Sequence, residues 1–243
     1  MPSFCIYPNV QKEWAVEMVM DLSQHLMKHG YRYTRTNPDY CIVIGGDGTL
    51  YHFLDELQGK VILIGSETTY MAQLSKDNWR ERIIDLMENG KIVKLPVLEV
   101  KSDSHTIGYA MNDIAFHTND HRVVHVNCTF DKQRMEFKGD GIIIATPFGS
   151  SAYSFSAGGK KLPLTSKSIA ITPICPYLRS VSSRTTSGER IDVSISYNAS
   201  LILDGKLALV SCKDRDYSII RSKRTVEFLQ WKKQRSSKKL SMR

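Results

Sequence analysis

The sequence predicts a fold of mixed class, α/β plus all-β: a three-layer α/β domain at the N-terminus, followed by a β-rich domain. In the first part, strand-like runs alternate with helical periods, which is typical of a parallel sheet covered by helices on both faces. From about residue 96 to 221, strand-like runs follow one another with almost no helical period. A chain of 243 residues is long enough for two modest domains. We expect domains at residues 1–95 and 96–221, with residues 222–243 as a candidate addition to the first.

The elements of the first domain follow from the spacing of its apolar residues. Apolar side chains recur every three or four positions over residues 12–29, and Gly30 is well placed to end that helix. The same period starts after the glycines at 45–48 and stops at Gly59. The expected order is a helix at 12–29, a short strand at 31–36, a buried strand at 40–44, a helix at about 50–57, a strand at 60–65 and a helix at about 78–88.

The second domain is expected to consist of short strands joined by turns. Residues 117–122 and 203–206 have the composition of hairpin tips. Residues 224–234 are expected to form a short helix that packs on either domain. The expected strands are 107–116, 123–130, 141–145, 168–172, 191–196, 201–203 and 207–210.

Composition excludes several classes of protein. No apolar stretch approaches the roughly 18 residues of a membrane span, and the start lacks a secretory pattern, so we expect a cytoplasmic protein. The five isolated cysteines contain no CxxC pair and indicate neither a disulfide framework nor a metal site. Six basic residues and no acid lie in residues 231–243, so without them the net charge falls from +8 to +2. This basic tail is expected to be solvated, and we expect no nucleic-acid partner.

A glycine-rich motif, Gly45-Gly46-Asp47-Gly48-Thr49, separates a buried strand from a helical period. Glycines let a backbone approach an anion, and a carboxylate among N–H donors can bind Mg²⁺ or accept a proton from an attacking hydroxyl. The alternative is a tight turn in which Asp47 caps the helix. The motif is neither GxGxxG nor a Walker loop.

Two further motifs lie in the β-rich part. Residues 138–159 contain many hydroxyl side chains that can donate to phosphates or ribose, while Gly149, Ala152 and Ala157 leave room for a planar ligand. The alternative is an ordinary polar loop. Asn112 and Asp113 interrupt a strand-like run; such a pair can recognise a base edge and sugar hydroxyls, or else marks a β-bulge or turn.

Together and in this order, the motifs resemble the NAD kinase family, which transfers a phosphoryl group from ATP or polyphosphate to the 2′-hydroxyl of the adenosine of NAD and so makes NADP. The matching stretches read GGDGT, ND and DGIIIATPFGSSAYSFSAGG, with AITPICP and LILDGK after them, over residues 41 to 206. The resemblance implies the NAD kinase-like fold, Mg²⁺ as cofactor, ATP as donor, and a homodimer or homotetramer.

The resemblance also implies roles for individual residues. Asp47 corresponds to the family's proton acceptor. The positions that it implies for binding NAD or ATP are Gly45, Gly46, Gly48, Thr49, His52, Asn112, Asp113, Lys138, Asp140, Ser151, Ala152, Tyr153, Ser154, Phe155, Ser156, Asp204 and Lys206.

Three departures from the family pattern concern the expected site. Asp113 stands for the usual Glu, and Lys206 for a frequent Gln. Residues 61–74 keep little of the family's loop at that place. Two alternatives therefore stay open beside NAD kinase: a lipid kinase of the diacylglycerol or sphingosine type, which shares GGDGT, and a dinucleotide-binding protein without turnover.

Overall fold

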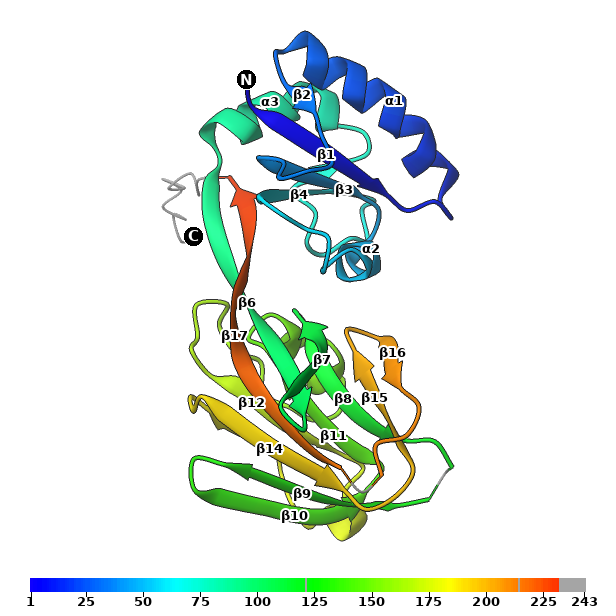
Figure 1. Cartoon of the computed structure of the whole chain (residues 1–243), viewed down its shortest axis with the longest axis vertical. Coiled ribbons are helices and arrows are strands. Elements are labelled where there is room, and N and C mark those ends of the chain that lie inside the picture. Colours follow the sequence, from blue (N-terminus) through cyan, green and yellow to red (C-terminus); the bar gives the residue numbers. More distant parts are fainter. Residues whose placement is uncertain (121, 214, 232–243) are drawn as a thin grey trace, which may run out of the picture. The chain divides into compact units, whose positions relative to one another are not determined.

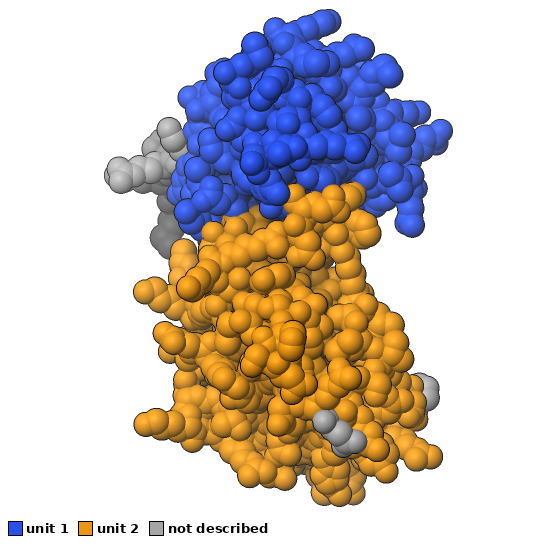
Figure 2. Space-filling view, in the orientation of Figure 1, with its two compact units in different colours: residues 1–50, 57–94, 227–243 blue, residues 51–56, 95–226 orange. Residues whose placement is uncertain are grey.

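The computed structural model describes residues 1–120, 122–213 and 215–231, which divide into two compact units (Figures 1 and 2). Unit 1 contains residues 1–50, 57–94 and, at the C-terminal end of the described chain, 227–231. Unit 2 contains residues 51–56 and 95–226. Each unit has its own hydrophobic core.

Unit 1 is built on a parallel sheet, as the alternation of strands and helices predicts. The strand order is β17-β4-β3-β1-β2, and β5 pairs with β4. β17 joins through Glu227 and Phe228, which pair in parallel with Lys60 and Val61. The strands are β1 (Ser3–Pro8), β2 (Arg32–Tyr33), β3 (Tyr40–Ile44), β4 (Lys60–Gly65), β5 (Leu74–Ser75) and β17 (Asp216–Gln230).

Two helices, α1 (Glu13–Lys28) and α3 (Trp79–Asn89), cover one face of this sheet (Figure 1). Their buried residues share a cluster with Phe4, Ile42 and Ile62, which alternate with neighbours that point to the other face. On that other face, the Cys41 thiol donates to the Gln58 carbonyl. Both helices lie within a residue of their expected positions.

The helix after the glycines is shorter than expected. α2 (Asp47–His52) ends at His52, and turns follow it, with the amide of Glu56 donating to the carbonyl of Phe53. Leu54 and Leu57 are nevertheless buried. Successive turns bury these residues at the same spacing as a helix would. The pattern of apolar residues alone therefore does not distinguish the two structures.

Unit 2 contains two antiparallel sheets that face each other. One has the order β13-β12-β11-β8-β15-β16; the other contains β10-β9-β14-β17, with β6 beside β17 and β7 beside β6. The strands are β6 (Lys91–Ser102), β7 (His105–Ala110), β8 (Asp113–Thr118), β9 (Val124–Phe130), β10 (Gln133–Gly139), β11 (Gly141–Ala145), β12 (Ile169–Ile174), β13 (Arg184–Thr186), β14 (Arg190–Ile195), β15 (Ala199–Leu203) and β16 (Lys206–Leu209).

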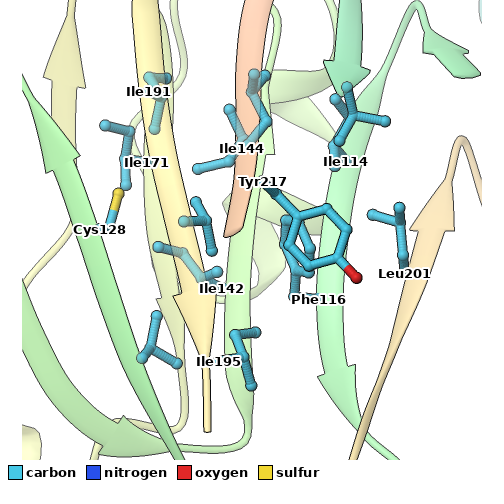
Figure 3. Close-up of a cluster of buried hydrophobic side chains, with 14 of the residues drawn as sticks. Ile114, Phe116, Cys128, Ile142, Ile144, Ile171, Ile191, Ile195, Leu201 and Tyr217 are labelled. Atoms are coloured by element: carbon cyan, nitrogen blue, oxygen red, sulfur yellow. The ribbon is translucent and has the colours of Figure 1, made fainter. Parts of the chain in front are cut away.

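The core of unit 2 lies between these sheets (Figure 3). Ile114 and Ile144 come from one sheet, and Cys128, Ile191 and Tyr217 come from the other. Each of these side chains is at most 1% exposed. Burial of a large apolar side chain contributes roughly 1.5–3 kcal/mol, so alternate residues of the strands supply most of the stabilisation.

Three expectations for the β-rich part are wrong. The run 107–116 is two strands, because the chain bends at Met111 and Asn112. The segment 117–122 is not a hairpin tip: β8 pairs with β11 and β15, whereas β9 pairs with β10 and β14. The segment expected to be a C-terminal helix is the end of β17 as far as Gln230, and residues 232–243 lie outside the described chain.

The tip at 203–206 is a hairpin, as expected. Leu203 pairs with Lys206, and Asp204 and Gly205 between them have φ of 49° and 78°. Both values lie in the left-handed region that a two-residue hairpin turn requires. Within the described ranges, no helix is both long and apolar enough to cross a membrane.

Candidate active site

The glycine-rich turn of unit 1 is held by Thr49. The Thr49 Oγ1 accepts hydrogen bonds from Asn9 Nδ2 at 3.1 Å and from the amide of Gly46 at 3.3 Å. It lies so close to Gly45 that a Cβ there would be 2.3 Å from it, which makes glycine necessary. At Gly48, by contrast, a Cβ would meet nothing within 4 Å. Packing within the chain thus explains Gly45 and the buried Thr49, but it does not explain Gly48.

Asp47 begins α2, and both of its carboxylate oxygens accept hydrogen bonds from another loop. The Tyr70 amide donates to Oδ2 and the Met71 amide to Oδ1, each at 3.0 Å. These donors belong to residues 66–71, within the segment that departs from the family pattern. The carboxylate therefore does not act mainly as the helix cap that the turn alternative requires; it is held in a defined orientation.

In unit 2, Asp204 organises the bend that carries Asn112. The Asp204 carboxylate accepts hydrogen bonds from the amides of Met111 at 2.8 Å, Asn112 at 2.7 Å and Asp113 at 3.0 Å. The Asp204 amide donates back to the Asp113 carbonyl at 3.0 Å. Because three of its acceptor sites are used by backbone amides, this side chain positions the Asn112 bend.

Asn112 and Asp113 form a polar pair at that bend. Asn112 Nδ2 donates to Asp113 Oδ2 at 2.8 Å, and Asp113 is only 4% exposed. Burial, together with the nearby Asp204 charge, raises the pKa of Asp113 to about 7, although the bond from Asn112 opposes the shift. Burial also raises the pKa of Asp204 to about 6, although the three hydrogen bonds from amides and the Lys206 charge lower it.

The hydroxyl-rich segment covers the outer face of the β8-β11-β12 sheet. Ala115, Ile143 and Ala170 on that face pack with Ala157 and Leu162 of the segment. Asp113 is on the same face as Ala115, since residues two apart in a strand point the same way. The segment therefore lies over the strand face that bears Asp113.

Several hydroxyls of this segment are turned inward. The Ser154 hydroxyl is 2.8 Å from the Thr172 hydroxyl, and both are buried. Thr146 Oγ1 donates to the Met111 carbonyl at 2.7 Å. A Cβ on Gly149 would lie 1.9 Å from the Asn112 carbonyl, so this glycine permits close packing and does not simply leave room for a ligand. Ser154, which the motif suggests as a binding residue, supports the segment.

The segment contains η1 (Gly149–Ser151), whose first two residues are buried, and α4 (Tyr153–Ser156), most of which is exposed. Tyr153 and Phe155 are 40% and 48% exposed. Burial of part of its ring, and then the Asp113 charge, raise the pKa of Tyr153. The expected binding residues that are exposed here are Ser151, Ala152, Tyr153, Phe155 and Ser156.

Four further expected residues of unit 2 lie outside the Asn112 bend itself. Lys206 Nζ donates to the His52 carbonyl at 2.7 Å, so these two are brought together in unit 2. Lys138 is exposed on β10, in the sheet opposite the one that contains β8, the strand that follows Asn112. Asp140 follows β10, and its amide donates to the Ile174 carbonyl at 2.9 Å.

The comparisons with known proteins agree with the motifs. The family described as "ATP-NAD kinase C-terminal domain" matches residues 111–231. The NAD kinase of Sulfurisphaera tokodaii is 31% identical over 227 residues, which cover 88% of this chain and 88% of the relative. The NAD kinase of Fusobacterium nucleatum is 33% identical, over 73% of this chain and 71% of the relative. The chain belongs to the NAD kinase family.

Solved structures show that the fold is the one that NAD kinases adopt. An NAD kinase from Archaeoglobus fulgidus, solved in complex with ATP, has a TM-score of 0.80 at 22% identity and covers 95% of this chain and 94% of its own. Yeast NADH kinase, solved with NADH, has a TM-score of 0.85 at 18% identity and covers 100% of this chain and 90% of its own. As a member of the NAD kinase family, the chain is an enzyme, a phosphotransferase.

The sequence motifs do not single out two features of the site of this NAD kinase. One is the pair of amides at Tyr70 and Met71, and the other is Thr172, the partner of Ser154. A sequence signal for the first exists: residues 44–49 read IGGDGT, and residues 64–69, after the next strand, read IGSETT. The spacing of glycine and threonine is the same in both.

Proposed function

We propose that this NAD kinase transfers the γ-phosphoryl group of ATP to the 2′-hydroxyl of the adenosine ribose of NAD, giving NADP and ADP. The observation that carries the proposal is Asp47: a carboxylate at the end of a parallel strand, in a glycine turn, with both oxygens oriented by amides. The relatives' names and the ATP and NADH in the neighbouring structures support the choice of substrates.

In the proposed reaction, Asp47 takes the proton of the attacking hydroxyl. The 2′-oxygen forms a bond to the γ-phosphorus while the bond from that phosphorus to the bridging oxygen of ADP breaks. The proton passes to Asp47 and later to solvent. Each carboxylate oxygen accepts one amide bond, at 3.0 Å, and keeps a second lone-pair direction for the ribose hydroxyl.

The residues present fit Mg²⁺ only as an ion carried by the nucleotide. Among the described residues, no three His, Cys, Asp or Glu side chains gather into a metal site. Mg²⁺ commonly binds one or two carboxylates together with phosphate oxygens and water, and Asp47 can supply the carboxylate. When bound, the ion neutralises charge on the transferring phosphoryl group.

The Asn112 bend would hold the dinucleotide. An amide and a carboxyl group side by side offer donors and acceptors to ribose hydroxyls or a base edge, and the exposed ring of Tyr153 offers a stacking surface. Asp204 keeps the bend in shape through its three amide bonds. This division leaves binding to Asn112 and Asp113 and the proton transfer to Asp47.

The test is to incubate the purified chain with ATP, Mg²⁺ and NAD and to measure NADP with an NADP-specific dehydrogenase. An Asp47→Asn variant should lose activity by about 10²–10⁴-fold, because the amide cannot take the proton, while NAD binding stays close to wild type. Near-normal turnover of this variant would exclude Asp47 as the base.

Other outcomes distinguish the alternatives. Phosphorylation of diacylglycerol or sphingosine without NADP would favour a lipid kinase. NAD binding without product would favour a protein that has lost turnover. Parallel reactions with NADH as acceptor or polyphosphate as donor identify the substrates in use.

We also propose that the enzyme is a cytoplasmic homodimer or homotetramer, as expected of its family. Light scattering coupled to size-exclusion chromatography measures the mass directly. A mass equal to the 27.6 kDa of one chain at micromolar concentration would contradict this.

A further inference from the structure

The turn after β4, residues 65–69, has the same local structure as the glycine turn after β3, residues 45–49. In the first, the amide of Gly46 donates to Thr49 Oγ1 at 3.3 Å and the Thr49 amide donates to the Gly46 carbonyl at 2.9 Å. In the second, the Ser66 amide donates to Thr69 Oγ1 at 3.1 Å, and the Thr69 amide to the Ser66 carbonyl at 3.0 Å.

The two turns also share the contact between glycine and threonine. A Cβ on Gly45 would lie 2.3 Å from Thr49 Oγ1, and a Cβ on Gly65 would lie 2.5 Å from the Cβ of Thr69. The turns stand at the ends of neighbouring parallel strands, and the Gly45 amide donates to the Ile64 carbonyl at 2.9 Å. Each threonine therefore stabilises its turn by packing against a glycine and accepting a hydrogen bond from a backbone amide.

The second turn leads directly to the donors that hold Asp47. Thr69 is followed by Tyr70 and Met71, whose amides each lie 3.0 Å from one oxygen of the Asp47 carboxylate. Two bonds to two oxygens fix the rotation of the carboxylate as well as its position. The direction of its free lone pairs consequently depends on the path of the chain at Thr69.

We propose that Thr69 is a positioning residue for Asp47: its hydroxyl shapes the 65–69 turn so that the next two amides orient the carboxylate. The inference rests on the proposed role of Asp47 as the proton acceptor. It assigns a function to the loop that departs from the family pattern. In that loop, Thr69 makes the same hydrogen bond to the turn that Thr49 makes in GGDGT.

The test compares three substitutions in the full chain. Thr69→Val removes the hydroxyl and keeps the shape, and it should lower kcat by about 10- to 100-fold, because a misoriented base reacts slowly. The KM values for NAD and ATP should stay within about 3-fold of wild type, since the lost interaction acts on the chemical step. Thr69→Ser, which retains the hydroxyl, should restore most of kcat.

Thr68→Val is the matched control. Thr68 is exposed, and its hydroxyl lies 3.2 Å from that of Ser66. The Ser66 amide donates to Thr69 Oγ1, however, and it is Thr69 that directly precedes the two donor amides. Thr68→Val should keep wild-type kcat. Wild-type kcat in Thr69→Val, or an equal loss in Thr68→Val, would overturn the proposal, as would a Thr69→Val loss confined to KM.

A second readout does not depend on turnover. Hydrogen exchange at the amides of Tyr70 and Met71 should be about 10-fold faster in Thr69→Val than in wild type, with amides of β3 and β4 unchanged. Asp47→Ala should also expose these two amides, which tests the pair even where Thr69→Val folds poorly. Unchanged exchange at these amides in a folded Thr69→Val variant overturns the inference, and so does unchanged exchange in Asp47→Ala. Failure of the proposed function is distinct: the wild-type protein would then make no NADP.

Discussion

At the scale of single residues, the distinctive feature is a pair of neighbouring carboxyl groups, the buried Asp113 and the partly buried Asp204, which have different roles. The Asp204 carboxylate accepts hydrogen bonds from three backbone amides, whereas the Asp113 carboxylate accepts one, from the Asn112 side chain. Asp113 is one methylene shorter than the glutamate of the family pattern. Its burial near a second carboxyl group makes it a neutral acid for part of the physiological pH range.

The raised pKa of Asp113 predicts how stability changes with pH. An unfolded aspartate has a pKa near 3.9, and Asp113 in the fold has a pKa of about 7, so between these values only the folded state holds the proton. Stability should therefore fall as the pH rises from about 4 to 7, by at most about 4 kcal/mol. In Asp113→Asn this pH dependence of the free energy of unfolding disappears, and only the smaller pH dependence due to Asp204 remains.

Urea unfolding at several pH values between 4 and 8 measures this difference. The free energies of wild type and Asp113→Asn should diverge across the window, with the variant gaining relative stability at high pH. Parallel curves would show that Asp113 ionises in the folded state as it does in the unfolded chain.

At the scale of elements, the hydroxyl-rich segment is a structural layer as well as a binding surface. Ser154 bonds Thr172 beneath it, and Gly149 lies against the Asn112 carbonyl. In α4, Ser154 is buried, whereas Tyr153, Phe155 and Ser156 are exposed. One short segment thus joins the face of β12 to the Asn112 bend, and packing at one end is expected to affect binding at the other.

Gly149→Ala tests this coupling. The added Cβ would lie 1.9 Å from the Asn112 carbonyl, so the segment or the bend must move. We expect a loss of about 1–3 kcal/mol in the free energy of unfolding and weaker NAD binding. Ser151→Ala, an exposed neighbour, should leave the melting temperature unchanged. Calorimetry of NAD binding and thermal melts check both; an unaffected Gly149→Ala would contradict the packing.

At the scale of the whole molecule, β17 contributes to both units. Its first residues pair with β14 in unit 2, and Glu227 and Phe228 pair with β4 in unit 1. Phe228 is fully buried. The C-terminal part of the described chain is therefore needed to complete the parallel sheet that carries Asp47.

Phe228→Ala is expected to destabilise the chain by about 3–5 kcal/mol, because it leaves a cavity beside β4. Ile92→Ala, at a residue that is 44% exposed, is the control and should cost much less. Chemical unfolding monitored by circular dichroism measures the difference. Equal, small losses for both variants would contradict the assignment of Phe228 to the core of unit 1.

The fold class, the helices α1 and α3, the 203–206 hairpin and the family could all be predicted from the amino-acid sequence. These features depend on the spacing of apolar residues, on turn residues and on motifs, all of which are set by residues close together in the sequence. The helix expected at 224–234 was wrong because β-sheet pairing with distant strands decides the structure of that segment.

The contacts between side chains and distant backbone amides could not be predicted and follow from the folded structure. Asp204 holds Asn112 across 92 positions of the chain, and the amides of Tyr70 and Met71 reach Asp47 across 23 and 24 positions. The folded structure also showed that Ser154 faces inward while Tyr153 faces outward. The physical reason is that motifs specify residue types, whereas the orientation of a carboxylate is set by hydrogen bonds from segments that only folding brings together.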